Sequence, residues 1–300
     1  MGHLLNALIS GLASATPMFL TAAGLTMIYG VMRVLNFAHG SFFMIGAYVV
    51  AEVLEQKTHG FWMFMGAAVL AGIVVAVVAV IAEEAVFKRL DRSDHLVSLL
   101  ASYALSLIIA GGMIQIFGPA AKIQPQTPLL NGAWQPGGIL IAHNDVFMLA
   151  IGLVVGAAVW LLMNKTPFGY QAVAVADDHE MAAGLGVRVK WIAAGVFAVG
   201  GFLAGLAGGL VSPEYAIAPG LDSLFLLQSF AVVIVGGLGS IGGSFGASVL
   251  LGVITGIVDQ YAPSLAGYSF YISMALVLMI RPQGLAFARK PRGWSKEVAS

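Results

Sequence analysis

The 300-residue chain contains no cysteine, which excludes disulfide bonds and any metal centre or cluster held by thiolates. Charged residues are also scarce. They make up 9% of this chain, of which 59% is hydrophobic, whereas an average soluble domain carries about 25% charged residues. So few polar groups cannot cover the surface of a soluble globule. We therefore expect one all-α polytopic membrane domain over residues 1–300, with lipid as the solvent for most of its surface.

Motifs for several kinds of chemistry are missing as well. No G-x-x-x-x-G-K-[ST] phosphate loop occurs, so the chain has no nucleotide-hydrolysing site of this kind. There is no H-E-x-x-H, and the six histidines show no metal-type spacing. The 14 basic and 14 acidic residues cancel, which removes the electrostatic argument for nucleic-acid binding. We expect no catalytic residues, no metal, no cofactor and no nucleic-acid partner.

Long apolar runs dominate what is present. Five are about long enough to cross a ~30 Å hydrocarbon layer as helices: residues 4–29, 61–81, 96–117, 146–163 and 191–211. Four shorter runs, interrupted by glycine or polar residues, cover 35–53, 224–235, 244–258 and 268–280. The sequence therefore predicts eight or nine membrane helices, some of them short or broken. We interpret the first run as a membrane helix rather than a cleaved signal, because no Lys or Arg precedes it.

Basic residues set the predicted orientation. If the 164–190 loop is cytoplasmic and the loops alternate from there, 12 of the 14 Lys and Arg residues lie inside, and only Lys57 and Lys122 lie outside. This is the bias of the positive-inside rule. The N-terminus is then outside and the C-terminus cytoplasmic. The Pro- and Gly-rich loop 118–145 lies outside, either as an ordered surface loop or as a docking face for a partner.

Polar residues interrupt the apolar stretch VLNFAHGSFFMIGAY at 34–48, which contains Asn36, His39 and Ser41. Polar groups in hydrocarbon are costly unless the protein uses them. His39 and Ser41 do not face each other on a helix, which argues against an intramembrane hydrolase. Short, glycine-interrupted segments in both halves instead indicate a solute site near the membrane midplane. The candidate path residues are Asn36, His39, Ser41, Gln228 and Ser229.

Glycines cluster in the same two regions. Residues 237–242 spell G-x-G-x-x-G, but they join two hydrophobic segments instead of following a strand, which argues against nucleotide binding. Glycines at membrane depth allow close helix packing or a backbone break. We expect a bulky residue at Gly237 or Gly242 to impair folding or transport. The candidate structural glycines are Gly40, Gly236, Gly237, Gly239, Gly242 and Gly243.

The 164–190 loop is more than a simple connector. Thr166-Pro167 is a helix-start signal, and alanines, an acidic group and a Gly-x-Gly follow. We expect a short helix outside the membrane and then a turn. Such a helix is either a solvated surface element or the contact that a permease without its own ATPase offers to one.

Four blocks of sequence resemble one known family. They are LNFAHGSFFMIGAY at 35–48, PFGYQAVAVADDHEMAAGLGV at 167–187, VVIVGGLGSIGGSFGA at 232–247 and RPQGL at 281–285. In this order they resemble the first permease type of the branched-chain amino acid class of bacterial ABC importers. The resemblance covers nearly the whole chain.

The resemblance implies a larger machine in the bacterial inner membrane. Its other parts would be a second, related permease, two cytoplasmic ATPases that use ATP, and a periplasmic substrate-binding protein. The 167–187 block resembles the family's coupling helix, which seats in the ATPase. Its candidate coupling residues are Ala176, Asp177, Asp178, Glu180, Ala182, Gly184 and Gly186. Bulky changes at Ala182 or Gly186 are expected to abolish capture of the ATPases.

The sequence departs from the family at two positions of this block. Relatives commonly have arginine where this chain has Tyr170 and Val173, so a salt bridge from these positions to the ATPase is not expected. Substrate identity stays open among branched-chain amino acids, urea or short amides, and aromatic or other carboxylates. A stand-alone ion-driven carrier or a channel is the alternative mechanism.

The distribution of Lys and Arg between the loops predicts a membrane topology that can be tested. A reporter fused after Ser300 should report the cytoplasm, and a tag inserted at Gly132 should be labelled by a membrane-impermeant reagent added outside intact cells. The same tag should be labelled no better after the cells are permeabilised. A tag at Gly132 that is protected until permeabilisation would contradict the orientation.

Overall fold

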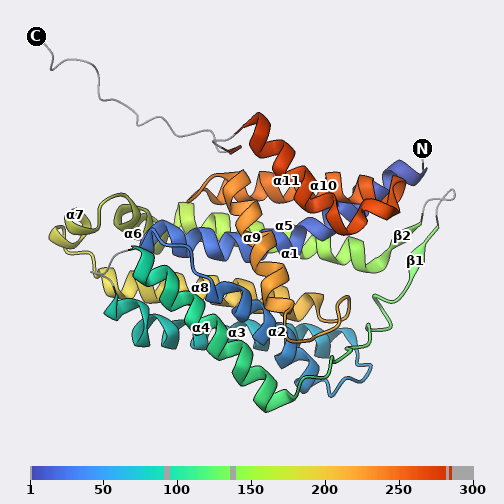
Figure 1. The fold of residues 1–300 in the computed structure, drawn as a ribbon, viewed down its shortest axis with the longest axis horizontal. Helices are drawn as coiled ribbons and strands as arrows, with labels where there is room; N and C mark the ends of the chain where they lie inside the picture. Colours follow the sequence, from blue (N-terminus) through green and yellow to red (C-terminus); the bar gives the residue numbers. More distant parts are fainter. Residues whose placement is uncertain (1, 91–94, 136–139, 282–283, 286–300) are drawn as a thin grey trace, which may run out of the picture.

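The computed structural model describes residues 2–90, 95–135, 140–281 and 284–285, which form a bundle of helices (Figure 1). The α-helices of these residues are α1 Gly2–Met32, α2 Ala38–Val53, α3 Phe61–Ala85, α4 His95–Phe117, α5 His143–Lys165, α6 Pro167–Asp177, α7 His179–Gly184, α8 Val189–Val211, α9 Leu221–Gly236, α10 Ile241–Tyr261 and α11 Ala266–Ile280. Two short 3-10 helices are η1 Phe87–Arg89 and η3 Pro263–Leu265. Strands β1 Ala133–Trp134 and β2 Ile141–Ala142 pair as a small antiparallel hairpin.

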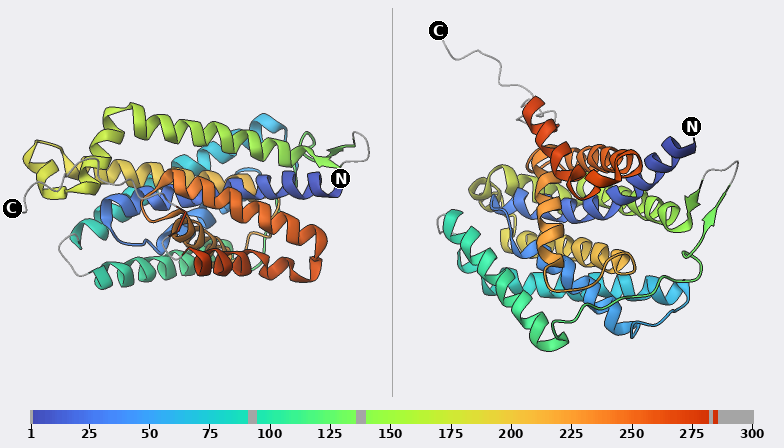
Figure 2. Two further views of the ribbon diagram at one scale, coloured as in Figure 1. Left: turned by 90° about the horizontal axis from the view of Figure 1, so that it is seen from above. Right: turned by 45° about the vertical axis from the view of Figure 1, so that its right-hand side comes forward.

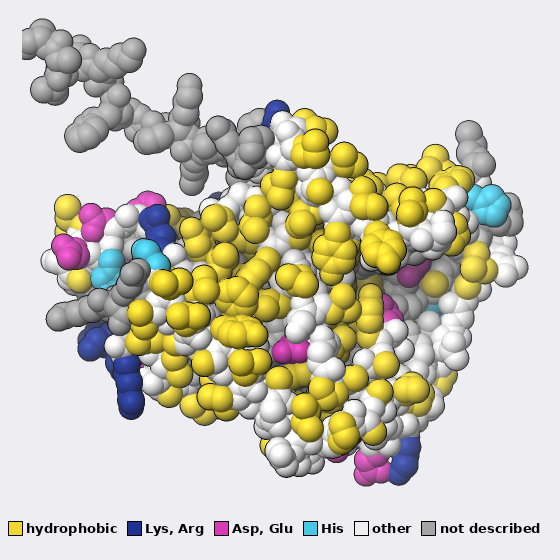
Figure 3. Space-filling view, viewed as in Figure 1, with side chains coloured by type: hydrophobic (Ala, Val, Ile, Leu, Met, Phe, Trp, Pro, Cys, Tyr) yellow, Lys and Arg dark blue, Asp and Glu magenta, His cyan; other side chains and the backbone are white. Residues whose placement is uncertain are grey.

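All nine apolar segments expected from the sequence are helical. Within the described residues, six helices are long and apolar enough to cross a membrane, namely α1, α3 with η1, α4, α5, α8 and α10. The apolar helices α2, α9 and α11 are shorter. Figure 3 shows apolar side chains over the middle of the visible face and charged side chains mainly towards its ends. The chain is thus an all-α polytopic membrane protein, while the number of crossings and the single-domain organisation stay predictions.

The long helices run along one axis of the bundle, and α9 lies across them (Figures 1 and 2). The N-terminal end of α1 and the β1–β2 hairpin lie at one end of this axis, and α6 and α7 lie at the other. We call these the hairpin end and the α7 end. Helices α1 and α8 are largely buried, whereas α4 and α5 expose most of their apolar residues.

Small residues allow the buried helices to approach one another closely. A side chain at Gly24 of α1 would lie 2.6 Å from the carbonyl oxygen of Gly200 in α8. On another face of α8, Gly46 of α2 packs directly on the backbone of Gly205. Lipid tails are as apolar as leucine, so membrane helices associate through close packing of this kind rather than by escaping from water. Helix α8 is therefore the axis on which α1, α2 and α3 assemble.

The expected break at 236–243 is a sharp corner between α9 and α10. Gly237 and Gly239 have φ values of +91° and +82°, which residues with a Cβ rarely adopt. The Ser240 hydroxyl then caps α10 by accepting a hydrogen bond from Gly243 N–H at 3.0 Å. Gly236 and Gly243 pack backbone against backbone. Leu285, from the RPQGL block, donates its N–H to the Val235 carbonyl at 2.6 Å; Pro282 and Gln283 lie outside the described residues.

The candidate structural glycines, in the corner and in α2, have different surroundings. Gly40 and Gly236 also pack against other backbone, Gly40 against the carbonyl of Asp222. A Cβ at Gly242 would meet no atom within 4 Å, and the same holds at Gly239, although its positive φ disfavours a side chain. Packing within this chain therefore gives no reason for a small side chain at Gly242 to disturb the fold, and the effect of a bulky residue there on folding or transport stays a prediction.

The part of the expected 118–145 loop that the structure describes, 118–135 and 140–145, is tied to its neighbours at the hairpin end. Lys122 and Ile217 exchange two backbone hydrogen bonds of 2.9 Å, and the Lys122 amine forms an ion pair with Glu52. Gln124 is 2% exposed and donates to the Lys57 carbonyl at 2.9 Å. These contacts support the interpretation as an ordered surface loop, and partner docking on this face stays a prediction.

The glycine corner gives a prediction with an internal control. Gly243→Ala places a methyl group against the Gly236 carbonyl, and overpacking of this kind costs about 1–3 kcal/mol of stability. Gly242→Ala fills open space and should leave stability within about 0.5 kcal/mol. Thermal unfolding of the two purified variants in detergent measures the difference. Equal melting temperatures for the two variants would contradict the corner geometry.

Candidate functional site

The first candidate site begins where α1 ends and α2 starts. Arg33, with a φ of +55°, terminates α1, and residues 33–37 form the break that the sequence predicted. Asn36 is 1% exposed, and its Oδ1 accepts a hydrogen bond from Ala38 N–H at 2.9 Å. The bond satisfies one of the N–H groups that have no partner in the first turn of a helix. The Asn36 Nδ2 donor is buried without a partner among the described residues.

His39 fastens α2 to α1. Its ring is fully buried, and Nε2 lies 2.9 Å from the Thr21 carbonyl oxygen. A carbonyl oxygen only accepts hydrogen bonds, so Nε2 carries the proton and Nδ1 of the neutral ring is an acceptor. Nδ1 is buried and has no partner within the described part of the chain. Thr21 belongs to the turn after Pro17 in α1, and its own hydroxyl donates to the Pro17 carbonyl at 2.7 Å.

Serines join α2 to α4 next to this corner. The Ser41 hydroxyl lies 3.1 Å from the Ser106 hydroxyl, and Phe37 N–H donates to Ser102 Oγ at 3.1 Å. Sequence reasoning missed Ser102 and Ser106, although together with Ser98 they are spaced four residues apart on one face of α4. Buried serines of this kind hold membrane helices together.

The two candidate path residues of α9 differ in whether their polar atoms have hydrogen-bond partners. Ser229 donates back to the Phe225 carbonyl at 2.6 Å, which satisfies its hydroxyl within the helix. The Gln228 Oε1 is buried without a partner in the described chain. Helices α2 and α9 pack on each other, with Gly40 against the Asp222 carbonyl and Phe37 edge-on to Phe230 at 5.1 Å between ring centroids.

No nucleophilic site emerges from these groups. Residues 242–246 spell G-x-S-x-G, the motif of a strand-to-helix nucleophile elbow, but Ser244 lies in the first turn of α10 without a preceding strand. Its hydroxyl is 2.8 Å from that of Thr26 and is buried. Of the candidate path residues, Ser41 and Ser229 therefore have hydrogen bonds that stabilise the helices, and their part in the path stays a prediction. Asn36 and His39 each use one polar side-chain atom in a hydrogen bond and leave the other buried without a partner among the described residues. Gln228 leaves its Oε1 buried in the same way.

The second candidate site is the helix pair α6–α7. Thr166 and Asp178 cap the two helices by accepting from Gly169 N–H at 3.2 Å and from Met181 N–H at 2.8 Å. Asp178 is extended, and this separates the single helix expected from the sequence into two. The guanidinium of Arg33 donates to the Ala176 carbonyl at the end of α6, where the helix dipole favours a positive charge.

Burial at one position and backbone conformation at another separate the candidate coupling residues into two groups. Ala182 is 3% exposed and faces the bundle, and Gly186 ends the segment with a φ of +88°. Both positions therefore maintain the fold of the α7 segment. Met181 and Leu185, which sequence reasoning missed, are 61% and 79% exposed. They are an i, i+4 apolar pair on the face of α7 away from the bundle. Asp177, Asp178, Glu180 and Gly184 are also exposed.

The two ends of the bundle differ in charge. At the hairpin end, removal from bulk water raises the pKa of Glu214; a hydrogen bond from Asn144 lowers it, and the charge of Asp145 raises it. At the α7 end the described chain carries Arg33, Lys88, Arg89, Lys165, Arg188 and Lys190. This asymmetry is compatible with the α7 end being cytoplasmic. The basic residues at 92 and 289–296 lie outside the described residues.

Comparison with known proteins gives the context of these sites. The family model described as "Branched-chain amino acid transport system / permease component" matches residues 7–280. The chain belongs to this family. The match contains both candidate sites and all nine apolar helices. No solved structure matches the chain.

Three related permease proteins match 90% or more of this chain. The high-affinity branched-chain amino acid transport system permease protein BraD of Pseudomonas aeruginosa is 27% identical, over 94% of this chain and 95% of BraD. The corresponding LivH of Escherichia coli K12 is 25% identical, again over 94% and 95% of the two chains. The permease protein LivM of the same strain is 25% identical, over 90% of this chain and 67% of LivM.

Substitution of Asn36 separates its two side-chain roles. Asn36→Ser retains a good capping acceptor but removes the Nδ2 donor, so the protein should fold normally while its transport rate falls by about fivefold, the equivalent of ~1 kcal/mol. Asn36→Leu removes the cap as well and should also lower thermal stability by about 1 kcal/mol. Uptake and unfolding are measured on the same preparations.

Asn164→Ser is the matched control for this test, because Asn164 is exposed at the end of α5. It should leave both uptake and stability unchanged. Wild-type uptake by Asn36→Ser, with only Asn36→Leu unstable, would restrict Asn36 to the capping role.

Proposed function

We propose that the chain is a transmembrane permease subunit of an ATP-driven ABC importer that carries branched-chain amino acids across the bacterial inner membrane. The observation that carries this proposal is the family match over residues 7–280 of a chain with nine apolar helices. The relatives LivH and LivM are both named as permease proteins of a branched-chain amino acid transport system. Urea, short amides and aromatic or other carboxylates are the alternative substrates.

Energy enters this permease from partner subunits. The chain has no phosphate loop, so two cytoplasmic ATPases supply ATP hydrolysis, and α6–α7 is the element that contacts one of them. Met181 and Leu185 provide an apolar contact on the outer face of α7, and Glu180 and Asp177 lie exposed beside it. The buried Ala182 and the caps Thr166 and Asp178 hold this face in a fixed position on the bundle. Motion of the ATPase then reaches α1 through Arg33.

A second, related permease completes the passage, and a periplasmic substrate-binding protein delivers the solute at the hairpin end. The break before α2 and the corner after α9 each disturb a short helix, as is common in helices that line transporter sites. Asn36 Nδ2 offers a donor, and His39 Nδ1 and Gln228 Oε1 offer acceptors. A zwitterionic amino acid needs both kinds of group. All three atoms are buried in this chain, so their use requires a helix rearrangement during transport.

Transport by the reconstituted four-part complex tests this function. Leucine uptake into proteoliposomes should require ATP, stop with a hydrolysis-deficient ATPase and persist with an uncoupler. Leu185→Asp should lower ATPase capture and uptake by more than about tenfold, since loss of an anchoring contact of 2 kcal/mol or more is typical of an interface centre.

Leu129→Asp is the matched control, because Leu129 is an exposed leucine on the hairpin side of the chain, with 61% exposure. It should leave ATPase capture intact. Uptake that an uncoupler abolishes, and that continues without ATP hydrolysis, would support an ion-driven carrier instead. Normal ATPase capture by Leu185→Asp would remove α7 from the proposed interface. Variants at Ala182 or Gly186 are poor tests, because they disturb the local fold.

A further inference from the structure

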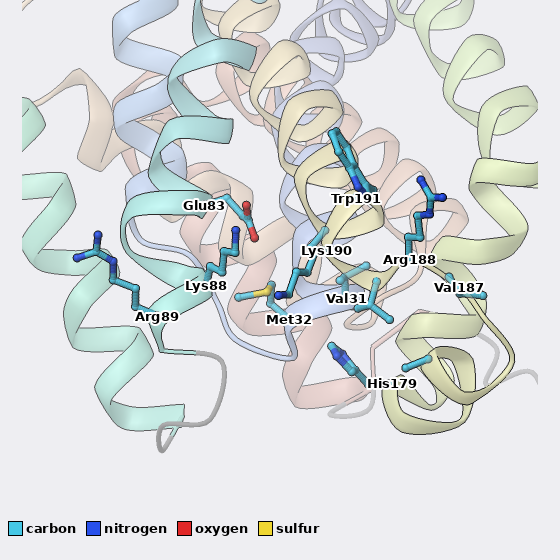
Figure 4. Close-up of a pocket in the computed structure, with 13 residues that line it drawn as sticks. Val31, Met32, Glu83, Lys88, Arg89, His179, Val187, Arg188, Lys190 and Trp191 are labelled. Carbon is cyan, nitrogen blue, oxygen red and sulfur yellow. The ribbon is translucent and has the colours of Figure 1, made fainter.

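A cavity of about 790 Å³ opens at the α7 end of the bundle. Its walls come from the ends of α1 and α3, from η1, from one side of α7 and from the start of α8 (Figure 4). The charged or titratable lining residues are Glu83, Lys88, Arg89, His179, Arg188 and Lys190. None of the candidate path residues lines it, so this is a site separate from the buried polar groups at α2 and α9.

The lining has an excess of positive charge. Four basic side chains oppose one carboxylate, that of Glu83, which gives a formal charge of +3 with His179 neutral. Figure 4 draws the Glu83 carboxylate and the Lys88 amine on the same side of the cavity, and Lys88 also pairs with Glu84. Lys88 is thus largely compensated. Arg89, Arg188 and Lys190 form no ion pair within the described residues.

Backbone electrostatics adds to this excess. Helix α8 begins at the cavity, and its N-cap residue Arg188 provides no side-chain acceptor for the first N–H groups. The N-terminus of a long helix carries a partial positive charge that favours anions. Side chains and helix therefore favour the same kind of ligand, one with a negatively charged head.

The remaining walls are apolar. Val31, Met32, Val189, Ala193 and Trp191 line the cavity beside the charges. Trp191 is 74% exposed in the first turn of α8, and tryptophan favours the boundary between the hydrocarbon and the headgroups. A basic pocket between helix ends at this boundary fits the headgroup of an anionic lipid. A free phosphate would make no use of the apolar walls.

We propose that this cavity binds an anionic phospholipid, with its phosphate held at the start of α8 by Arg188 and Lys190 and the start of its acyl chains against Trp191 and Met32. The leaflet that supplies the lipid follows from the proposed orientation, but binding itself does not depend on the transport function. His179 and Ala183 of α7 line the cavity, on the side opposite Met181 and Leu185. A bound lipid therefore braces α7 from behind.

Lipid binding to the purified full chain in detergent tests the proposal without ATPases. Native mass spectrometry should show that phosphatidylglycerol is retained more strongly than phosphatidylethanolamine, and that inorganic phosphate at millimolar concentration does not displace it. The Arg188→Gln/Lys190→Gln double variant should bind phosphatidylglycerol about 30-fold more weakly, since each basic residue near an anionic lipid contributes about fivefold.

The Lys57→Gln/Lys165→Gln double variant is the matched control, because it removes two positive charges from residues that do not line the cavity. It should bind phosphatidylglycerol like the wild type. Thermal unfolding without added lipid checks that both double variants fold.

Four results would overturn the proposal. Equal retention of the two lipids would remove the anion preference, and equal losses in both double variants would remove the site. Displacement by inorganic phosphate would assign the cavity to a soluble anion. If Arg188→Gln/Lys190→Gln keeps its lipid but loses the ATPases, the basic residues form a protein contact instead. The first three of these results do not bear on ATP-dependent uptake, which is measured separately.

Discussion

Inside a hydrocarbon layer an apolar side chain gains little by leaving lipid for another apolar side chain, so the helices of this chain need another reason to associate. Close backbone contact supplies it. Gly24 of α1 packs on Gly200, and Gly46 of α2 packs on Gly205. Helices α1 and α2 therefore lie on different faces of α8. The remaining architecture depends on these crossings, because α4 and α5 add mainly exposed apolar surface around them.

Buried hydrogen bonds then fix the orientation of helices that glycine alone leaves free to slide. His39 binds the Thr21 carbonyl, and Ser41 binds Ser106. Each bond satisfies a buried polar group. Burying such a group in an apolar environment without a hydrogen bond costs about 2–7 kcal/mol. The polar residues that first suggested a solute path thus also hold the fold together. Asn36 Nδ2 and His39 Nδ1, like Gln228 Oε1, are buried without a partner among the described residues, and their use in transport stays a proposal.

The two roles proposed for the α7 end meet in one short helix. One side of α7 exposes Met181 and Leu185, and the opposite side closes the basic cavity through His179 and Ala183. Residues two positions apart on a helix point in nearly opposite directions. A six-residue helix can therefore face an ATPase on one side and the bundle on the other, with Ala182 packed between them.

The sequence by itself determined the class of the protein, the nine apolar helices, the breaks before α2 and after α9, and the family, because hydropathy, glycine and short motifs are local properties. It also indicated a helix in the 164–190 loop. Only the tertiary structure decided which side each residue faces. It buried Ala182, exposed Leu185 and left Gly242 open although its neighbour Gly243 is tightly packed. It also brought Arg89 and Arg188, 99 residues apart, into one cavity. In lipid, apolar residues suit both the protein interior and the outer surface, so hydropathy does not report helix orientation.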